Sequence, residues 1–301
     1  MSPVFLITGA DGQLGLELAR ALAPYGKVWA LGRSECDLAD ASKLNATLEN
    51  IRPDFVFNAA AFTAVDLAES QQVAAYRVNA AAPAEIADWA EKNNAILLHY
   101  STDYVFDGKS TTPYLETSPT HALSIYGDSK LKGELAVLDR SAKAFVLRTS
   151  WMHSPHGHNF LKTMLRLMSD RESINVVADQ YGIPTAASLV ANLSALVVQR
   201  CLQKDDVEFG LYHVSSSGLS TWHEYARQIL LLGKKYNLPL LCKADGVKAI
   251  PGSEYPLPAK RPAYSALNSA KFEKAFGVYM PPWLEEVEQT VRIIAEAHYE
   301  K

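Results

Sequence analysis

A tyrosine and a lysine four residues apart carry the clearest chemical signal in this sequence. They stand in the segment Tyr126-Gly-Asp-Ser-Lys130. On a helix, residues at this spacing lie on the same face. A phenol has a pKa of about 10, and a nearby ammonium favours its ionised form. The pair is therefore suited to donating a proton to a carbonyl oxygen during reduction, although the same spacing occurs in many helices by chance.

The size of this effect sets a condition on the chemistry. Lowering the pKa of a phenol from about 10 to about 7 needs roughly 4 kcal/mol of differential stabilisation. One ammonium at about 4 Å supplies about 1 kcal/mol in water, and about 4 kcal/mol at an effective dielectric constant of about 20. Lys130 can therefore assist Tyr126 sufficiently only in a closed site that excludes most of the water.

Glycines near the start of the chain predict a binding site for a dinucleotide. The segment Gly9-Ala-Asp-Gly-Gln-Leu-Gly15 directly follows the apolar run 4–8 and opens a helical pattern. Glycines permit a tight turn and a close approach of the backbone to a pyrophosphate, and the helix adds unpaired N–H groups. The GxxGxxG spacing differs slightly from the general GxGxxG pattern. The expected cofactor contacts are Gly9, Asp11, Gly12, Gln13, Leu14 and Gly15; the alternative is a turn that serves packing only.

The end of the second expected strand bears on the choice of dinucleotide. An acidic residue there favours NAD, whereas an arginine accommodates the 2′-phosphate of NADP. This chain has Leu-Gly-Arg33-Ser and no acid at the strand tip. NADPH is therefore expected in preference to NADH, unless Arg33 is a solvated loop residue. Asp37 and Leu38 follow and are expected beside the adenine.

Two further strands end in residues suited to a cofactor and a carbonyl. Small residues at 59–61, followed by Thr63, would let a flat cofactor lie against the backbone, although they also suit tight packing of a helix on a sheet. The next strand ends in Ser-Thr102-Asp103-Tyr104. Open α/β sheets bind ligands at strand C-termini, so Thr102 is expected to donate to a carbonyl oxygen beside Tyr126. The cofactor candidates in the first of these segments are Ala59, Ala60, Ala61 and Thr63.

The elements that must position these residues alternate between strand and helix. Such alternation predicts an α/β fold, a doubly wound parallel Rossmann sheet with helices on both faces. Residues 1–152 are expected to form the dinucleotide-binding domain, with 174–215 returning to it. Residues 153–173 and 216–301 are expected to form a smaller, partly interleaved α/β region for the substrate. The expected strands are 4–8, 28–31, 55–60, 96–101, 144–149, 175–178 and 211–214, and the expected helices are 13–22, 41–51, 81–91, 129–138, 160–171 and 189–201.

Composition narrows the class of partner. The 301 residues are 48% hydrophobic and 21% charged, with a net charge of −4 and no basic block, which argues against a nucleic-acid partner. Neither a secretory signal nor an apolar run long enough to span a bilayer is visible. Three scattered cysteines without a CxxC argue against a disulfide framework and fit a cytoplasmic location. The expected partner is a small molecule, with no membrane association.

Taken together, these motifs identify a resemblance. The strand–GxxGxxG turn, Asn-Ala-Ala-Ala, Ser-Thr-Asp-Tyr-Val-Phe and Tyr-Gly-x-x-Lys resemble the extended short-chain dehydrogenase/reductases, and most closely their dTDP-4-dehydrorhamnose reductase family. The likeness covers nearly the whole chain. Further matching segments are Thr63-Ala-Val-Asp66-x-x-Glu69, Leu147-Arg-Thr-Ser-Trp151, Gly157-x-Asn159-Phe160, Asp179-Gln180-x-Gly182-x-Pro184-Thr185 and Arg261-Pro262-x-x-Ser265-x-Leu267.

The resemblance implies reduction of the C4 ketone of dTDP-6-deoxy-L-lyxo-4-hexulose (dTDP-4-dehydro-6-deoxy-L-mannose) to dTDP-L-rhamnose by NAD(P)H, in the synthesis of cell-surface polysaccharides. It makes Tyr126 the general acid, assigns Lys130 to the nicotinamide ribose and to tuning Tyr126, and places Thr102 at the carbonyl. The residues that it implies on the sugar side are Val65, Asp103, Tyr104 and Trp151, with Arg261 a candidate for the diphosphate.

Departures from the family bear on metals and assembly. Some members form a dimer around Mg²⁺ held by glutamates. Glu17 could supply one ligand, but Ser188 stands where a second is expected, so we predict no such Mg²⁺ site and a monomer or metal-independent dimer. His153 replaces the usual tyrosine. With His156 and His158 it could bind Zn²⁺, but we expect a loop at the mouth of the sugar site and no metal.

Three other functions remain open. A nucleotide-sugar dehydratase would carry a glutamate where Tyr104 stands, which argues against elimination chemistry. A nucleotide-sugar epimerase would retain its NAD, whereas a reductase releases its cofactor at every turnover. A non-catalytic regulatory subunit, such as the related β subunit of methionine adenosyltransferase, would keep the scaffold for binding alone. The complete set of Thr102, Tyr126 and Lys130 favours an active reductase.

Overall fold

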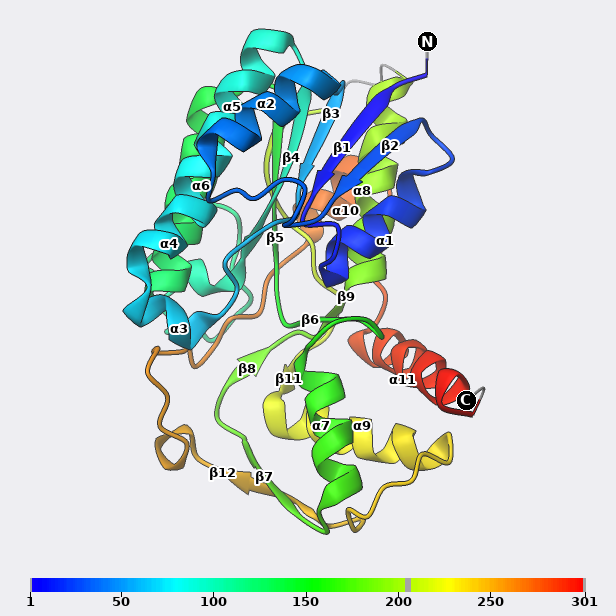
Figure 1. Cartoon of the computed structure of the whole chain (residues 1–301). Coiled ribbons are helices and arrows are strands. Elements are labelled where there is room, and N and C mark those ends of the chain that lie inside the picture. The colour runs from blue at the N-terminus through cyan, green and yellow to red at the C-terminus, as the bar shows by residue number, and fades with distance from the viewer. Residues whose placement is uncertain (1, 204–206, 300–301) are drawn as a thin grey trace.

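A six-stranded parallel sheet forms the centre of the larger part of the molecule. The computed structural model describes residues 2–203 and 207–299. The strand order is β10-β5-β4-β3-β1-β2 (Figure 1), and every neighbouring pair is parallel. The order reverses between β1 and β3, which opens a crevice at the strand C-termini. The strands are β1 (Val4–Thr8), β2 (Lys27–Leu31), β3 (Phe55–Asn58), β4 (Ile96–Thr102), β5 (Ala144–Thr149) and β10 (Gly210–His213).

Helices cover both faces of this sheet, which confirms the predicted doubly wound α/β fold. Successive side chains of a strand point to opposite faces. Phe5 and Ile7 pack in a core with α1 (Gln13–Leu22), α8 (Ala187–Leu202) and α10 (Ala270–Phe276). Leu6 packs in the opposite core, against α2 (Ala41–Ile51), α5 (Ala82–Asn93) and α6 (Ile125–Arg140). Figure 1 shows the two helical layers on either side of the strands.

A third core, in the smaller region, lies below the sheet in Figure 1. Helices α7 (Phe160–Asp170), α9 (Trp222–Lys235) and α11 (Trp283–Tyr299) contribute to it, beside the parallel pair β7 (Ile174–Val177) and β12 (Val247–Ile250). In the same region β8 (Tyr181–Gly182) pairs with β11 (Ser220–Thr221). No helix among the described residues is long and apolar enough to cross a membrane.

The boundary between the two regions differs from the expected one. The expected return of 174–215 to the large sheet is wrong in its first part, because β7 pairs with β12 in the smaller region. The return begins with α8, and β10 then completes the sheet. Phe272 of α10 also packs in a core of the large sheet, although 216–301 was assigned to the smaller region. The apolar residues of a short segment predict that the segment is buried. They do not indicate which core it packs against.

The helix that carries the tyrosine and lysine begins earlier than the expected residue 129. Ser124 is its N-cap, and the Ser124 hydroxyl accepts from the Gly127 N–H at 3.2 Å. Such a cap satisfies one of the unpaired amides of the first turn. Tyr126 and Lys130 therefore share one helix, as their spacing required. The elements without a counterpart in the prediction include α3 (Val65–Ser70), α4 (Gln72–Tyr76), a π-helical turn (Arg77–Ala81), β6 (Met152–His153) and β9 (Thr185–Ala186).

Candidate active site

A cleft of about 750 Å³ opens at the C-terminal ends of the strands. Almost all of the predicted site residues line this cleft, and those that do lie between Gly9 and Trp151 in the sequence. Gly15 and Arg261 are not among the residues that line it. The predicted residues that do line the cleft are Gly9, Asp11, Gly12, Gln13, Leu14, Arg33, Asp37, Leu38, Ala59, Ala60, Ala61, Thr63, Val65, Thr102, Asp103, Tyr104, Tyr126, Lys130 and Trp151.

The glycine turn packs against the alanine segment after β3. Gly9 has a φ of +73°, and a Cβ there would lie 2.7 Å from Ala60 Cα. A Cβ on Gly15 would lie 2.7 Å from Ala10 Cα, so Gly15 allows the helix to pack against its own turn. No larger residue fits either position without displacing backbone. The turn therefore brings the N-terminus of α1 to the cleft, where the amides of the first helical turn and the helix dipole suit a phosphate group.

Deeper in the cleft, two buried hydroxyls fit a bound ligand. Ser101 Oγ and Thr149 Oγ1 have no hydrogen-bond partner among the described residues, although both are buried and both residues line the cleft. Buried polar atoms are normally hydrogen-bonded. The glycine turn and these hydroxyls therefore suit a nicotinamide dinucleotide, with its phosphates at the turn and polar groups farther in.

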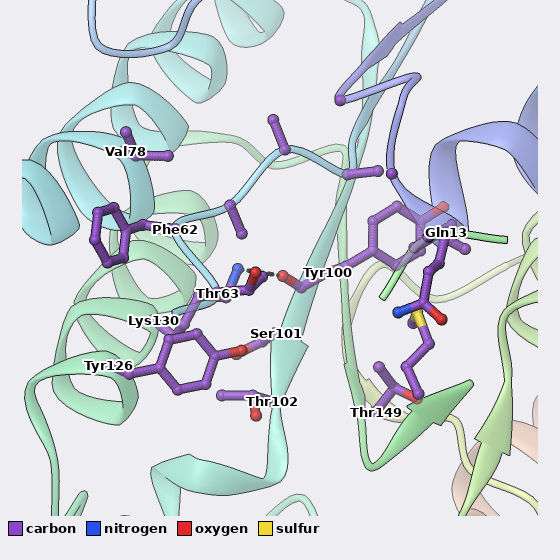
Figure 2. A pocket seen from close by; sticks show the side chains of 18 of the residues that line it. Gln13, Phe62, Thr63, Val78, Tyr100, Ser101, Thr102, Tyr126, Lys130 and Thr149 are labelled. Atoms are coloured by element: carbon purple, nitrogen blue, oxygen red, sulfur yellow. Dashed lines mark hydrogen bonds between the residues drawn. The ribbon is translucent and has the colours of Figure 1, made fainter. Parts of the chain in front are cut away.

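Tyr126 lines the cleft and is half-buried. Figure 2 shows its hydroxyl directed toward the end of β4, beside Ser101 and Thr102. A hydrogen bond with Thr102 lowers the pKa of the phenol, but burial outweighs it and raises that pKa to about 12. Burial removes water from the charged form, so the phenol holds its proton firmly in this state.

Lys130 lies one helical turn after Tyr126, and its ammonium binds a backbone oxygen in this structure. Its Nζ donates to the carbonyl oxygen of Tyr100 at 2.5 Å, and burial lowers the pKa of the ammonium to about 8 (Figure 2). The pKa of Tyr126 is raised in this structure, and its lowering by Lys130 in a closed site that excludes water stays a prediction. The physical reason for the raised pKa is that desolvation of the phenol dominates while the ammonium binds a backbone oxygen.

A buried carboxyl stands beside the same tyrosine. Thr102 Oγ1 donates to Asp103 Oδ1 at 3.1 Å and accepts from the Tyr104 N–H at 3.2 Å. Asp103 is 2% exposed, and its burial raises the pKa of the carboxyl to about 6. The ring of Tyr104 meets that of Tyr126 edge to face, with centroids 5.5 Å apart. Polar and aromatic side chains thus surround the reactive hydroxyl.

The opposite end of the cleft carries both signs of charge. Arg33 Nε lies 3.4 Å from Asp37 Oδ2, and the arginine side chain is 84% exposed. The Ala39 N–H donates to Asp37 and holds the pKa of that carboxyl below its usual range. Leu38 is buried beside them. An exposed arginine and a carboxylate held by a backbone amide therefore both lie at the end predicted to hold the adenosine.

Arg261 is not among the residues that line the cleft, although its guanidinium lies beside Tyr104, which does line it. Its Nη1 and Nη2 donate to the two carboxylate oxygens of Asp66 at 3.0 and 2.8 Å. Asp66 Oδ1 also accepts from the Ala259 N–H at 3.1 Å. This bidentate pair engages the guanidinium that was expected to bind the diphosphate, and ties the C-terminal segment to α3.

Several residues of the site lack a recognisable sequence signal. Asn79, in the π-helical turn, accepts from the Phe62 N–H at 2.8 Å and donates to Ser129 Oγ at 3.0 Å, which links the loop after β3 to α6. Asn159 donates to Gln13 Oε1 at 2.8 Å. The cleft-lining residues not predicted as contacts are Cys36, Asn58, Phe62, Val78, Tyr100, Ser101, Thr149, Ser150, Met152, Gly157, His158, Asn159 and Trp222. Asn58, Ser101 and Thr149 stand at strand ends, and Gly157, His158 and Asn159 lie in segments that the sequence singles out, so their places in the cleft could have been inferred.

The three histidines after Trp151 occupy separate environments. His153 is buried, its Nδ1 lies 3.1 Å from Thr290 Oγ1, and burial lowers its pKa to about 3. His156 Nε2 lies 3.9 Å from Glu17 Oε1, and His158 lines the cleft. Across residues 2–203 and 207–299, no group of three or more histidine, cysteine or acidic side chains is placed to hold a metal ion.

Comparison with known proteins supports the same assignment. The family model described as RmlD substrate binding domain matches residues 4–296. A dTDP-4-dehydrorhamnose reductase of Escherichia coli (strain K12) is 43% identical over 282 residues, which cover 92% of this chain and 93% of the relative.

Two solved structures share the fold over nearly their full length. The dTDP-4-dehydrorhamnose reductase of Clostridium acetobutylicum ATCC 824 has a TM-score of 0.88 at 32% identity, covering 97% of this chain and 99% of its own. That of Bacillus anthracis strain Ames, in complex with NADP, has a TM-score of 0.87 at 32% identity, covering 96% and 99%. The chain therefore belongs to the dTDP-4-dehydrorhamnose reductase family, whose members are NAD(P)H-dependent oxidoreductases of nucleotide-sugar metabolism.

Proposed function

We propose that this enzyme reduces the C4 ketone of dTDP-4-dehydro-6-deoxy-L-mannose to give dTDP-L-rhamnose. One observation carries the proposal: the Tyr126 hydroxyl is directed toward the end of β4, beside Thr102, in the same cleft that the glycine turn at Gly9 and Gly12 lines. The names of relatives above 40% identity supply the sugar. A carbonyl oxygen placed beside Tyr126 and Thr102 would meet two hydroxyls suited to stabilising and protonating it.

In the proposed mechanism Tyr126 is the general acid. A reduced nicotinamide, when bound, supplies a hydride to C4. The Tyr126 O–H then breaks and its proton goes to O4, which becomes the product hydroxyl, while Thr102 hydrogen-bonds the same oxygen. A phenol with a pKa of about 12 gives up this proton only to a strongly basic oxygen such as a developing alkoxide. Protonation is therefore expected together with hydride arrival, not before it.

Lys130 and the glycine turn would hold the cofactor. Lys130 is assigned to the nicotinamide ribose, which requires its ammonium to share or exchange the Tyr100 carbonyl. The turn at Gly9 and Gly12 would receive the pyrophosphate. Arg33 would pair with the 2′-phosphate of NADPH, which is the basis for preferring NADPH to NADH. The cytoplasmic location belongs to the same proposal.

The sugar side of the cleft is assigned to Val65, Asp103, Tyr104 and Trp151. All four line it, and Asp103 offers a carboxyl oxygen to a sugar hydroxyl. Tyr104 stands where a dehydratase would need a glutamate, so a dehydratase is the less favoured function. An epimerase would retain its dinucleotide after purification, and absorbance of the purified protein checks this.

No Mg²⁺ site of the kind found in some relatives is proposed, because Ser188 replaces one expected ligand. Glu17 lies near Arg20 and His156, at 3.9 Å from each. The protein is proposed to be a monomer or a metal-independent dimer. Its sedimentation should be the same with Mg²⁺ and with EDTA; a dimer seen only with Mg²⁺ would contradict this.

The function is tested by NADPH oxidation with the dTDP-4-keto sugar generated in situ. The expected product is dTDP-L-rhamnose, identified by chromatography, with turnover supported better by NADPH than by NADH. A protein that binds NADPH but leaves this sugar unchanged would refute the proposed substrate. In that case a pull-down for a protein partner would test the non-catalytic alternative.

A further inference from the structure

Trp151 adopts a backbone conformation that a bulky side chain rarely takes. Its φ is +42°, in the left-handed region that favours glycine. Such strain persists only where surrounding structure holds it, and it clusters at functional sites. Here Ser150 Oγ donates to the Ile183 carbonyl at 2.7 Å, and the Thr185 N–H donates to the Trp151 carbonyl at 3.3 Å. Both bonds join the end of β5 to the segment that runs into β9.

The indole of Trp151 is confined on two sides. Its ring stacks on that of Trp222, with centroids 3.5 Å apart and planes 8° from parallel. Gly182 packs closely against the indole ring, because a Cβ on Gly182 would lie 2.6 Å from Cζ2 and Nε1 of Trp151. No side chain fits there unless the indole moves. The strained backbone, the stacked ring and the glycine together fix one orientation of Trp151.

Trp222 is itself held from behind. It begins α9, directly after the N-cap Thr221, whose hydroxyl accepts from the Glu224 N–H at 3.0 Å. Its ring lies 4.6 Å from that of Phe160, which joins the same aromatic group. Trp222 also lines the cleft, together with Trp151. The smaller region thus supplies a rigid aromatic wall to a cleft whose catalytic groups come from the large sheet.

We propose that Trp222 is a specificity-determining positioning residue, which holds the Trp151 indole as a fixed wall for the sugar of the nucleotide-sugar substrate. This rests on the proposed function. A deoxyhexulose presents an apolar methyl group and C–H groups as well as hydroxyls, and a flat, desolvated indole suits the apolar part. A fixed wall sets where the ketone lies relative to Tyr126, and a displacement of about 1 Å can cost about a hundredfold in rate.

The substitution Trp222→Phe tests this proposal, because a phenyl ring retains the packing on Phe160 but covers less of Trp151. We expect KM for the keto sugar to rise about tenfold, with KM for NADPH changed less than about twofold; tenfold corresponds to about 1.4 kcal/mol. Gly182→Ala would displace the indole of Trp151 by direct contact, so it should also raise KM for the keto sugar more than KM for NADPH. The matched control is Trp89→Phe, a buried tryptophan of α5 that bonds Glu49 and does not line the cleft.

A spectroscopic signal reports the stack without any turnover. Two stacked indoles give an exciton couplet in circular dichroism, which should be present in the wild type and in Trp89→Phe and lost in Trp222→Phe. Melting temperatures show whether each variant is folded.

Loss of the couplet with unchanged kinetics for the keto sugar would overturn the role of Trp222. Equal rises in KM for sugar and cofactor would overturn it too, since they indicate general disruption. A wild type that shows the couplet and binds NADPH but never turns over the keto sugar would instead refute the proposed function.

Discussion

The two ends of the cleft are built in different ways. At the end proposed to hold the cofactor, short segments at strand tips line the cleft, and the backbone itself shapes the surface, as at Gly9. At the sugar end, side chains from distant segments meet: Trp151 follows β5, Gly182 lies in β8 and Trp222 begins α9. A site for a dinucleotide, which many enzymes share, can be built from segments close in sequence. The proposed sugar site instead combines side chains from the two regions of the molecule.

Burial differs between the ends as well. Arg33 at the proposed adenosine end is mostly exposed, whereas Asp103 and Lys130 at the proposed reacting end are buried and Tyr126 is half-buried. An exposed charged side chain can replace its bound water with a ligand at a small cost in free energy. Buried ionisable groups shift their pKa values and hold their geometry. Substitutions at the reacting end should therefore change rate and stability strongly, and those at the adenosine end should change cofactor preference modestly.

Tyr126→Phe should have the largest effect and separates chemistry from cofactor binding. Removal of the general acid should lower kcat about a thousandfold, within the usual range of general acid catalysis. The dissociation constant for NADPH, measured by fluorescence titration, should change little because the ring remains. Tyr212→Phe is the control: Tyr212 is buried on β10 and does not line the cleft. A near wild-type kcat in Tyr126→Phe would remove the catalytic assignment.

Lys130→Ala should have the second largest effect, and it should weaken both cofactor binding and catalysis. Loss of the ammonium removes a cofactor contact and a charge near the reaction, so kcat should fall about a hundredfold and KM for NADPH should rise. The control is Lys132→Ala on the same helix, where the exposed ammonium pairs with Asp128 at 3.0 Å. An unchanged KM for cofactor in Lys130→Ala would reject its role at the ribose.

Asp103→Asn should trade activity for stability. The pKa of this carboxyl is about 6, against an ordinary value of 3.8, because burial penalises its charge. The folded state thus binds the proton more tightly than the unfolded state, and this advantage is present below about pH 4 and lost as the pH rises through about 6. Above that pH the folded protein carries a buried charge that asparagine lacks.

The free energy of unfolding of Asp103→Asn should exceed that of the wild type by roughly 3 kcal/mol at pH 8, taking about 1.4 kcal/mol for each unit of pKa shift. The difference should vanish near pH 4. Urea unfolding at the two pH values measures it, and a lower KM for the sugar in the variant would contradict the substrate role of Asp103. An equal difference at both pH values would show that packing, not charge, is responsible.

The same contrast explains what could be predicted from the sequence. The glycine turn, the small residues after β3 and the Tyr126–Lys130 spacing are local patterns, and each lies in the cleft. The stack of Trp151 on Trp222 joins residues 71 positions apart, and no periodicity reveals it. The guanidinium of Arg261 suits a diphosphate, but in the structure it binds Asp66, which lies nearly two hundred residues away in sequence. Local backbone chemistry is readable in the chain, whereas a side chain's partner across two regions is decided by packing.

Arg33→Ala should have the smallest effect and sharpens the account of the cofactor end. A charge-assisted hydrogen bond to the 2′-phosphate is worth about 1.5 kcal/mol at an exposed site, or about tenfold in affinity. KM for NADPH should rise by that factor and KM for NADH should stay constant, because only NADPH carries the phosphate. Asp37 lies 3.4 Å from Arg33 and, with the arginine gone, its carboxylate would repel the phosphate and accept from a 2′-hydroxyl. The variant should therefore favour NADH. Arg20→Ala, an exposed arginine on α1, controls for net charge. Equal rises in KM for NADPH and for NADH would mean that Arg33 acts through the general electrostatic potential of the protein. Arg33 would then make no specific contact with the 2′-phosphate.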